Sequence, residues 1–174
     1  VAVSRKQLED VKRRVADRRL AEHLHIIDTH LMILEDELLI DDSIDLIRGQ
    51  QINAEGALKR TLDKFRKVFD AIDDEYLRER RSDIDSVGER LLRNLIGADQ
   101  QSLADLERKS IVVAHDLSPA DTMQMDKNRV IGFITDVGGR TAHTAILARS
   151  LGIPAVASPV GVNDADVAGT AFEH

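Results

Sequence analysis

The spacing of apolar residues divides the chain into a helical part and a part that mixes strands with helices. Leu8, Val11 and Val15 follow one another at the steps of three and four residues that are typical of a helix facing a core. Longer series continue this spacing: Leu20, Leu24, Ile27, Leu31 and Leu34; Leu58, Leu62, Phe65, Phe69, Ile72 and Tyr76; and Ile84, Val87, Leu91 and Leu95. Consecutive amphipathic helices joined by short polar links predict a helical bundle.

Capping residues predict where these helices begin and end. Asn53 is placed to cap the series that runs to Tyr76. Ser82 and Asp85 have the spacing of a capping box, which predicts the start of the last helix. Gly97 is expected to end that helix, because glycine readily adopts the left-handed conformation found after helix ends.

The pattern changes after about residue 110. Short β-branched runs at 111–114, 130–134 and 155–157 predict buried strands. Ser118, followed by a proline, predicts the start of one helix, and a second helix is expected after His143. Strands that alternate with helices indicate an α/β arrangement.

Composition changes at the same point. All three prolines lie after residue 110, whereas most of the charged residues precede it. This shift predicts a domain boundary, with a helical domain at residues 1–108 and an α/β domain at residues 109–174. The expected fold class is therefore α+β or α/β, a helical bundle joined to a small α/β domain.

Charge and cysteine content exclude several classes of function. The formal net charge is −7, which argues against nucleic acid as a partner and favours a basic protein surface. The absence of cysteine excludes disulfides, thiolate chemistry and cysteine zinc sites. The sequence contains no apolar run of membrane-spanning length and no signal peptide, so we expect a cytoplasmic protein without membrane insertion.

The most informative segment places His143 between a glycine turn and the first turn of a helix. Helix N-termini present free N–H groups and attract anions, and a histidine ring nitrogen can accept a group covalently. Arg140 and Arg149 can bind phosphate oxygens, and Thr144 contributes an N–H group of the first turn. Two interpretations follow: a phosphoryl-accepting histidine, or a histidine that only caps the helix beside solvated arginines.

The other histidines carry a weaker signal. His23, His25 and His30 follow a helical pattern, but nothing in the sequence places further ligands beside them, so we expect surface or partly buried histidines and no metal site. His115 follows a strand and is expected to pack near His143 without reacting, and His174 is terminal.

An acidic segment, with Glu35-Asp36-Glu37 at its start, adjoins more apolar residues than one core stripe needs. The acidic residues can be a solvated helix end. Beside methionine and aliphatic side chains, they can equally form the rim of a partner-binding surface. Both interpretations remain open for this group, whose apolar members are Met32, Ile33, Leu38, Leu39 and Ile40.

Residues 132–154, which include Gly-Gly-Arg-Thr-Ala-His-Thr, resemble the phosphohistidine signature of enzyme I, the phosphoenolpyruvate-protein phosphotransferase of the bacterial sugar phosphotransferase system. Similar loops occur in pyruvate phosphate dikinase and phosphoenolpyruvate synthase. Residues 30–37, 73–80 and 90–94 also resemble the amino-terminal region of enzyme I, in the same order, and the dikinases lack that helical insertion.

The resemblance implies a swivelling α/β phosphohistidine domain with a helical subdomain that binds the carrier protein HPr. His143 matches the phosphorylated histidine, and Thr122 matches the threonine that hydrogen-bonds its ring. The matching positions on the HPr-binding face are Met32, Ile33, Glu37, Leu39, Phe69, Leu77 and Arg80. Phe69 and Leu77 also fall on or near the apolar helical series. Each can therefore lie either on the contact surface or in the core.

The chain departs from the family pattern at both ends, and we expect a piece truncated on both sides. It starts inside the first helix, its last residues do not read like the closing strand, and the sheet is expected to lack at least one strand. The carboxy-terminal barrel, which in the family binds phosphoenolpyruvate and Mg²⁺ and supplies dimer contacts, has no counterpart in the sequence. No cofactor is therefore expected in the chain itself.

The expected function is phosphoryl transfer from phosphoenolpyruvate through His143 to HPr, with this chain limited to the HPr-facing half. Two alternatives remain. The first is a nitrogen-regulatory enzyme I paralogue that uses another carrier protein. The second is a catalytically silent module that docks HPr.

Overall fold

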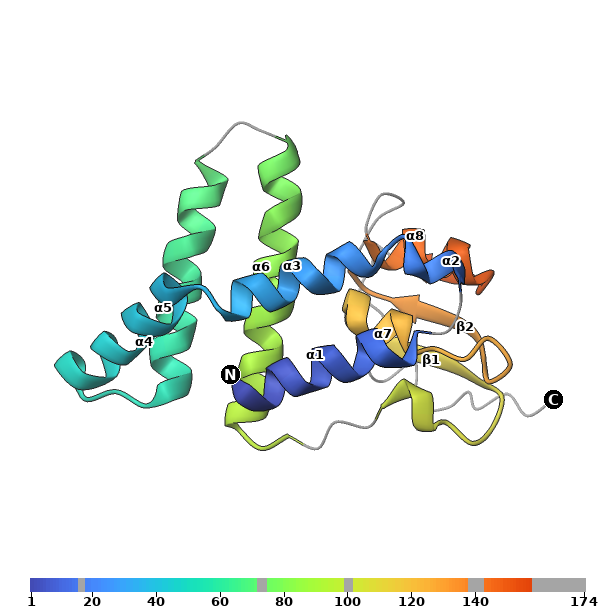
Figure 1. The fold of residues 1–174 in the computed structure, drawn as a ribbon, viewed down its shortest axis with the longest axis horizontal. Helices are drawn as coiled ribbons and strands as arrows, with labels where there is room; N and C mark the ends of the chain where they lie inside the picture. The colour runs from blue at the N-terminus through green and yellow to red at the C-terminus, as the bar shows by residue number, and fades with distance from the viewer. Residues whose placement is uncertain (16–17, 72–74, 99–101, 138–142, 158–174) are drawn as a thin grey trace. The chain divides into compact units, whose positions relative to one another are not determined.

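The computed structural model describes residues 1–15, 18–71, 75–98, 102–137 and 143–157 (Figure 1). These residues form two compact units. The first, here called the helical unit, contains Val1–Arg13 and Leu24–Gln100. The second, the α/β unit, contains Arg14–His23 and Gln101–His174. The sequence predicted two functional domains that meet at residue 108. That division by function stays a prediction. Within the described residues, the helices are too short or too polar to cross a membrane.

The described part of the helical unit contains five helices, and the last residue of α1, Arg14, belongs to the α/β unit. They are α1 (Ala2–Arg14), α3 (Leu24–Leu34), α4 (Glu37–Gln50), α5 (Ala54–Asp70) and α6 (Glu75–Leu95). The fully buried side chains of its core include Leu8, Ile27, Leu34, Leu62 and Val87. These residues belong to the apolar series, so the helical spacing identified the core.

Side-chain caps start two of these helices. The Asp36 carboxylate accepts hydrogen bonds from the backbone N–H groups at the start of α4, and the Asn53 side chain accepts one from Gly56 N–H at the start of α5. At the end of α6, Gly97 has a φ of 66°, and the Ala98 N–H donates to the Arg93 carbonyl at 3.0 Å. The predicted caps at Asn53 and Gly97 are confirmed.

Two helix boundaries differ from the prediction. The helix capped by Asn53 ends at Asp70, and Tyr76 belongs to α6 instead. The start of α6 lies at Glu75 and not at Ser82. Ser82 is exposed on the surface of α6, where a hydroxyl side chain does not interrupt the helix. A capping spacing alone therefore gave a false helix start.

Close packing and polar contacts fix α6 against its neighbours. A Cβ atom at Gly88 would lie 2.5 Å from a methyl carbon of Leu62, so glycine allows α5 and α6 to approach each other. Arg66 on α5 donates to Asp85 on α6 at 2.6 Å, and this hydrogen bond raises the pKa of Arg66. These contacts hold the antiparallel helices α5 and α6 together.

A buried polar pair joins α3 to α6. His30 is 1% exposed, and its Nε2 lies 3.2 Å from an Oδ1 oxygen of Asp83, which is 6% exposed. The sequence predicted a surface or partly buried histidine at this position, and that prediction is wrong. The helical pattern did not distinguish His30 from an exposed residue because its partner, Asp83, is remote in the sequence.

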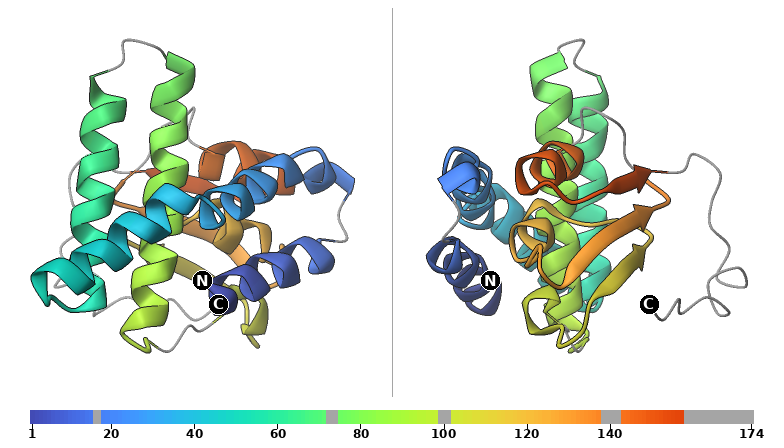
Figure 2. Two further views of the ribbon diagram at one scale, coloured as in Figure 1. Left: turned by 60° about the vertical axis from the view of Figure 1, so that its left-hand side comes forward. Right: turned by 90° about the vertical axis from the view of Figure 1, so that its right-hand side faces the viewer.

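The α/β unit contains a parallel three-stranded sheet. Its strands are β1 (Ser110–Ala114), β2 (Val130–Thr135) and β3 (Ala155–Ala157), in the order β1-β2-β3. Ala114 pairs with Thr135, which pairs with Ala157, so the three carboxyl ends lie in register. The helices α7 (Pro119–Met123) and α8 (His143–Leu151) lie on one face of the sheet (Figure 2).

The core of this unit lies between the sheet and these helices. Buried side chains from β2, α7 and α8 fill it, among them Phe133, Ala120, Met123, Leu147 and Leu151. The positions of the predicted strands and both predicted helix starts are confirmed. The prediction that these strands are buried is wrong for β3, because all three of its residues are exposed. The helix predicted through Leu20 and Leu34 is broken at residues 22–23, and its first turn, α2 (Arg18–Ala21), belongs to the α/β unit.

Candidate functional site

The carboxyl edge of the parallel sheet brings two helix starts to one place. The segment after β1 leads through Leu117 into α7, and the segment after β2 leads toward α8, which begins at His143. In open α/β sheets, ligands bind at this edge, outside the carboxyl ends of the strands. The histidine singled out by the sequence therefore lies where the topology favours a binding site.

His143 is the first residue of α8 and is half-buried. The N–H groups of the first helical turn have no partner within the helix and favour an anion beside it. The next residue, Thr144, donates its hydroxyl to the Leu117 carbonyl at 2.6 Å. This bond ties the start of α8 to the segment before α7, so His143 is presented by a fixed backbone.

Thr122 lies on α7, which packs against α8. Its side chain is fully buried, and its hydroxyl donates to the Ser118 carbonyl at 3.1 Å. Ser118 forms a capping box with Asp121, so the short helix that carries Thr122 begins at a well-defined point. With its proton already donated, the Thr122 oxygen is left to accept a hydrogen bond.

Arg149 lies on α8, and Arg140 falls outside the described residues. Arg149 lines a hollow of about 420 Å³ between the first turns of α8 and the carboxyl ends of β2 and β3. We call this space the edge hollow. Its other lining residues include Asp116, Phe133, Thr135, Thr144 and Val156.

His115 differs from its predicted environment. The side chain was expected to pack near His143, but it is 81% exposed. Its Nδ1 lies 3.1 Å from Oδ2 of Asp136, and the backbone N–H groups of Asp136 and Val137 both donate to the His115 carbonyl at 3.1 Å. Residues alternate along β1, and His115 continues the outward-facing positions of Ile111 and Val113. Because Ile111, Val112 and Val113 are all apolar, the sequence carried no signal for which face of β1 is exposed.

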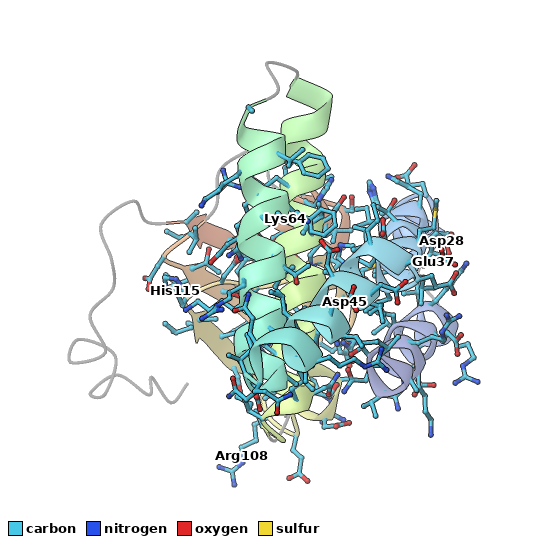
Figure 3. The ribbon with its side chains drawn as sticks, turned by 90° about the vertical axis from the view of Figure 1, so that its left-hand side faces the viewer. Asp28, Glu37, Asp45, Lys64, Arg108 and His115 are labelled. Atoms are coloured by element: carbon cyan, nitrogen blue, oxygen red, sulfur yellow. The ribbon has the colours of Figure 1, made fainter. Side chains whose placement is uncertain are left out.

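The acidic and apolar group of the sequence lies at the junction of α3 and α4. Met32 is 70% exposed and Leu38 is 64% exposed, and Glu37 is also exposed. Figure 3 shows Glu37 and Asp45 on α4 beside α5, which carries Lys64. Ile33 is half-buried. An exposed methionine and leucine beside carboxylates form a candidate contact surface.

Two of the other predicted contact residues, Leu39 and Phe69, differ from this pattern. Leu39 is 2% exposed and lies in the core beneath the surface. Within the first turn of α4, Leu39 faces inward, whereas Leu38 points outward. Phe69 on α5 is half-buried, and the side chains of Leu77 and Arg80 lie outside the described residues.

The remaining histidines form no metal centre in the described part of the chain. No group of three or more histidines and carboxylates there is placed to hold a metal ion. The Nε2 atom of His23 lies 3.1 Å from the Ser150 hydroxyl on α8, and His30 is paired with Asp83. His23 and His30 belong to different compact units.

Comparisons with known proteins match two parts of the chain to families that are described as PEP-utilising enzymes. Residues 1–80 match the family described as PEP-utilising enzyme, N-terminal. Residues 106–171 match the family described as PEP-utilising enzyme, mobile domain. The second match contains β1, α7, β2, α8 and β3, and therefore the whole candidate site around His143.

Individual relatives narrow this class. The chain is 42% identical over 157 residues to a phosphoenolpyruvate-protein phosphotransferase of Haemophilus influenzae, covering 90% of this chain and 27% of the relative. It is 46% identical over 173 residues to that of Cupriavidus necator, covering 94% of this chain and 29% of the relative. The chain belongs to the phosphoenolpyruvate-protein phosphotransferase (enzyme I) family and corresponds to its amino-terminal region.

Solved structures agree with this assignment. An NMR solution structure of enzyme I aligns with a TM-score of 0.75 at 39% identity, covering 94% of this chain and 66% of that chain. The N-terminal domain of "Enzyme 1 - Nitrogen" aligns with a TM-score of 0.62 at 28% identity, covering 88% of this chain and 62% of that one. The expected fold class, a helical region with a parallel α/β domain, is confirmed.

Proposed function

We propose that this chain carries a phosphoryl group on His143, received from phosphoenolpyruvate and passed to the carrier protein HPr. The observation that carries the proposal is the position of His143, the first residue of α8 at the carboxyl edge of the parallel sheet. The chain spans 27% to 30% of the length of the relatives compared, which are named phosphoenolpyruvate-protein phosphotransferases. The activity of the whole enzyme is therefore part of the proposal.

Thr122 gives the His143 ring its reactive form in this proposal. The Thr122 hydroxyl donates to the Ser118 carbonyl. In the proposed mechanism its oxygen accepts the N–H of one ring nitrogen of His143. The lone pair of the other ring nitrogen then attacks phosphorus in line with the leaving oxygen, so that a P–N bond forms as a P–O bond breaks. The free N–H groups of α8, together with Arg140 and Arg149, stabilise the phosphoryl oxygens. Thr144 contributes through its backbone N–H, since its hydroxyl binds the Leu117 carbonyl.

Replacing Thr122 with valine is expected to slow phosphoryl transfer to His143 about tenfold, because the ring loses the acceptor that selects its tautomer. Valine keeps the buried shape of threonine. The rate of labelling from phospho-HPr measures this effect, and Thr122→Ser, which keeps the hydroxyl, should restore the rate. Equal rates for Thr122→Val and the wild type would contradict the assigned role.

We propose that HPr docks on the surface made by Met32, Ile33 and Glu37, supported from beneath by Leu39. The exposed apolar side chains of α3 and α4, next to carboxylates, suit a partner with an apolar centre and a basic rim. Phe69, Leu77 and Arg80 extend the proposed surface along α5 and α6.

Replacing Glu37 with lysine is expected to weaken HPr binding about tenfold and to reduce its dependence on salt, since a carboxylate facing a basic partner is reversed. Isothermal titration at two salt concentrations measures both effects. Glu9→Lys makes the same change of charge at an exposed position on α1 and should leave the affinity unchanged. An equal loss of affinity in both variants would indicate net charge as the cause and would contradict the proposed surface.

The direct test of the proposed function is incubation of the chain with radiolabelled phospho-HPr. Label on the chain that is lost in acid but stable in base supports a phosphohistidine. Binding of HPr without label would instead support the silent docking module. Labelling by the nitrogen-regulatory carrier in preference to HPr would support the paralogue, an alternative suggested by the structural match to "Enzyme 1 - Nitrogen".

No residue of this chain is proposed to bind phosphoenolpyruvate or Mg²⁺. The resemblance assigns both to a carboxy-terminal domain, where Mg²⁺ would supply charge neutralisation for phosphoryl transfer. We further propose that the protein acts in the cytoplasm, where phosphoenolpyruvate and HPr are available to it.

A further inference from the structure

Two neighbouring backbone carbonyls hold two threonines that belong to the proposed site. The Leu117 carbonyl accepts the hydroxyl of Thr144 at 2.6 Å, and the Ser118 carbonyl accepts the hydroxyl of Thr122 at 3.1 Å. Thr144 follows His143 directly on α8, and Thr122 lies on α7. Both threonine side chains therefore depend on the conformation of one short segment.

The helix that carries Thr122 is too short to be stable by itself. It has five residues, Pro119–Met123, which is little more than one turn. The first turn of a helix fixes several residues for a single hydrogen bond, so a helix this short depends on its capping side chains and on packing. The bond from the Thr122 hydroxyl to the carbonyl four residues earlier requires a helical backbone, and it is lost if this turn opens.

Asp121 holds the turn in place through Ser118. The Oδ2 oxygen of Asp121 accepts the Ser118 hydroxyl at 2.6 Å and the Ser118 N–H at 3.2 Å. In return, the Ser118 hydroxyl oxygen accepts the Asp121 N–H at 3.2 Å. The carbonyl of the same serine accepts the Thr122 N–H at 3.0 Å, in addition to the Thr122 hydroxyl. One carboxylate thus fixes the residue whose carbonyl orients Thr122.

We propose that Asp121 is a positioning residue for phosphoryl transfer to His143, acting through Ser118 and Thr122. This inference rests on the proposed role of Thr122 as the acceptor of the His143 ring N–H. While the Thr122 hydroxyl donates to the Ser118 carbonyl, its oxygen offers the ring only lone pairs. If the turn opens, the hydroxyl can rotate and donate to the ring, which moves the ring proton to the nitrogen that has to attack phosphorus. Asp121 therefore selects the reactive tautomer through two intervening residues.

The rate test uses the whole chain and radiolabelled phospho-HPr. Asp121→Ala removes both bonds that the carboxylate accepts, and it should lower the labelling rate about fivefold, as for the loss of a typical helix cap. Asp121→Glu should recover most of the rate, since glutamate at this position also completes a capping box. Asp126→Ala is the matched control. Its carboxylate accepts the Asn128 N–H at 2.9 Å in a turn of the same unit, and its loss should leave the rate unchanged.

Two further measurements separate positioning from a general loss of stability. If Asp121 acts through Thr122, Asp121→Ala should cause little further loss of rate in a chain that already carries Thr122→Val. NMR of the ring nitrogens of His143 should show one main tautomer in the wild type and a mixture of tautomers in Asp121→Ala. A carboxylate that only stabilises the fold would leave the tautomer of the folded chain unchanged.

The outcomes distinguish this inference from the proposed function. A wild-type rate in Asp121→Ala, or an unchanged ring tautomer, would overturn the inference and leave His143 as the phosphoryl acceptor. Losses from Asp121→Ala and Thr122→Val that add in full would also overturn it, because Asp121 would then act by another route. If Asp121→Ala does not fold, Asp121→Asn decides: it keeps the size, weakens the acceptor and should show the same mixture of tautomers to a smaller extent, whereas an unchanged tautomer would contradict the inference. Absence of label on the wild-type chain would overturn the proposed function itself.

Discussion

Replacing His143 with glutamine is expected to reduce phosphoryl transfer into the chain to background, a loss of about a thousandfold or more. Glutamine has a similar size and polarity but no nucleophilic nitrogen. The start of α8 should be preserved, because the bond between the Thr144 hydroxyl and the Leu117 carbonyl does not involve the ring of His143. Quench-flow labelling with phospho-HPr measures the rate, and circular dichroism checks that the fold is unchanged.

His115 provides the matched control for this variant. It is a histidine at the same edge of the sheet, its side chain is 81% exposed, and its backbone contacts with Asp136 and Val137 survive a change of side chain. His115→Gln should therefore be labelled at the wild-type rate. Loss of label in His115→Gln, with label retained in His143→Gln, would show that His115 carries the phosphoryl group and would contradict the role proposed for His143.

Breaking the buried pair between His30 and Asp83 is expected to produce a large loss of stability. The two side chains are 1% and 6% exposed, and their contact of 3.2 Å joins α3 to α6. Truncating His30 to alanine leaves the Asp83 carboxylate buried without this partner, which costs about 3 kcal/mol in the free energy of unfolding. Urea denaturation followed by circular dichroism at 222 nm measures this change.

A double-mutant cycle separates the pair from the loss of packing. If the hydrogen bond matters, the loss in the double variant His30→Ala, Asp83→Ala should be smaller than the sum of the two single losses. The exposed pair Lys12–Asp28, whose atoms are 2.6 Å apart, gives the comparison, because such surface pairs contribute at most about 1 kcal/mol. A loss from Asp28→Ala that matched the loss from His30→Ala would contradict the importance of burial.

Local patterns predicted the elements that build the site. The β-branched runs located β1, β2 and β3, and the proline after Ser118 located the start of α7. The step from glycines to an apolar helical series located the start of α8 at His143. Each of these signals depends on residues that are close in the sequence, and for that reason it could be read without a structure.

Long-range contacts explain what the patterns missed. The burial of His30 depends on Asp83, which lies 53 residues away and on another helix. Leu38 and Leu39 are neighbours with the same apolar character, and only the packing of α4 decides that Leu38 is exposed and Leu39 is buried. The edge hollow likewise arises only when α8 is placed against β2 and β3.

The measurement that tests the central claim most directly is a map of the phosphorylated residue after reaction with phospho-HPr. The chain has six histidines, and tandem mass spectrometry under neutral or basic conditions can distinguish them. The proposed mechanism predicts a single phosphate on His143, at the ring nitrogen that Thr122 does not contact. Phosphate on any other histidine, or an unmodified His143 in a chain that binds HPr, would contradict it.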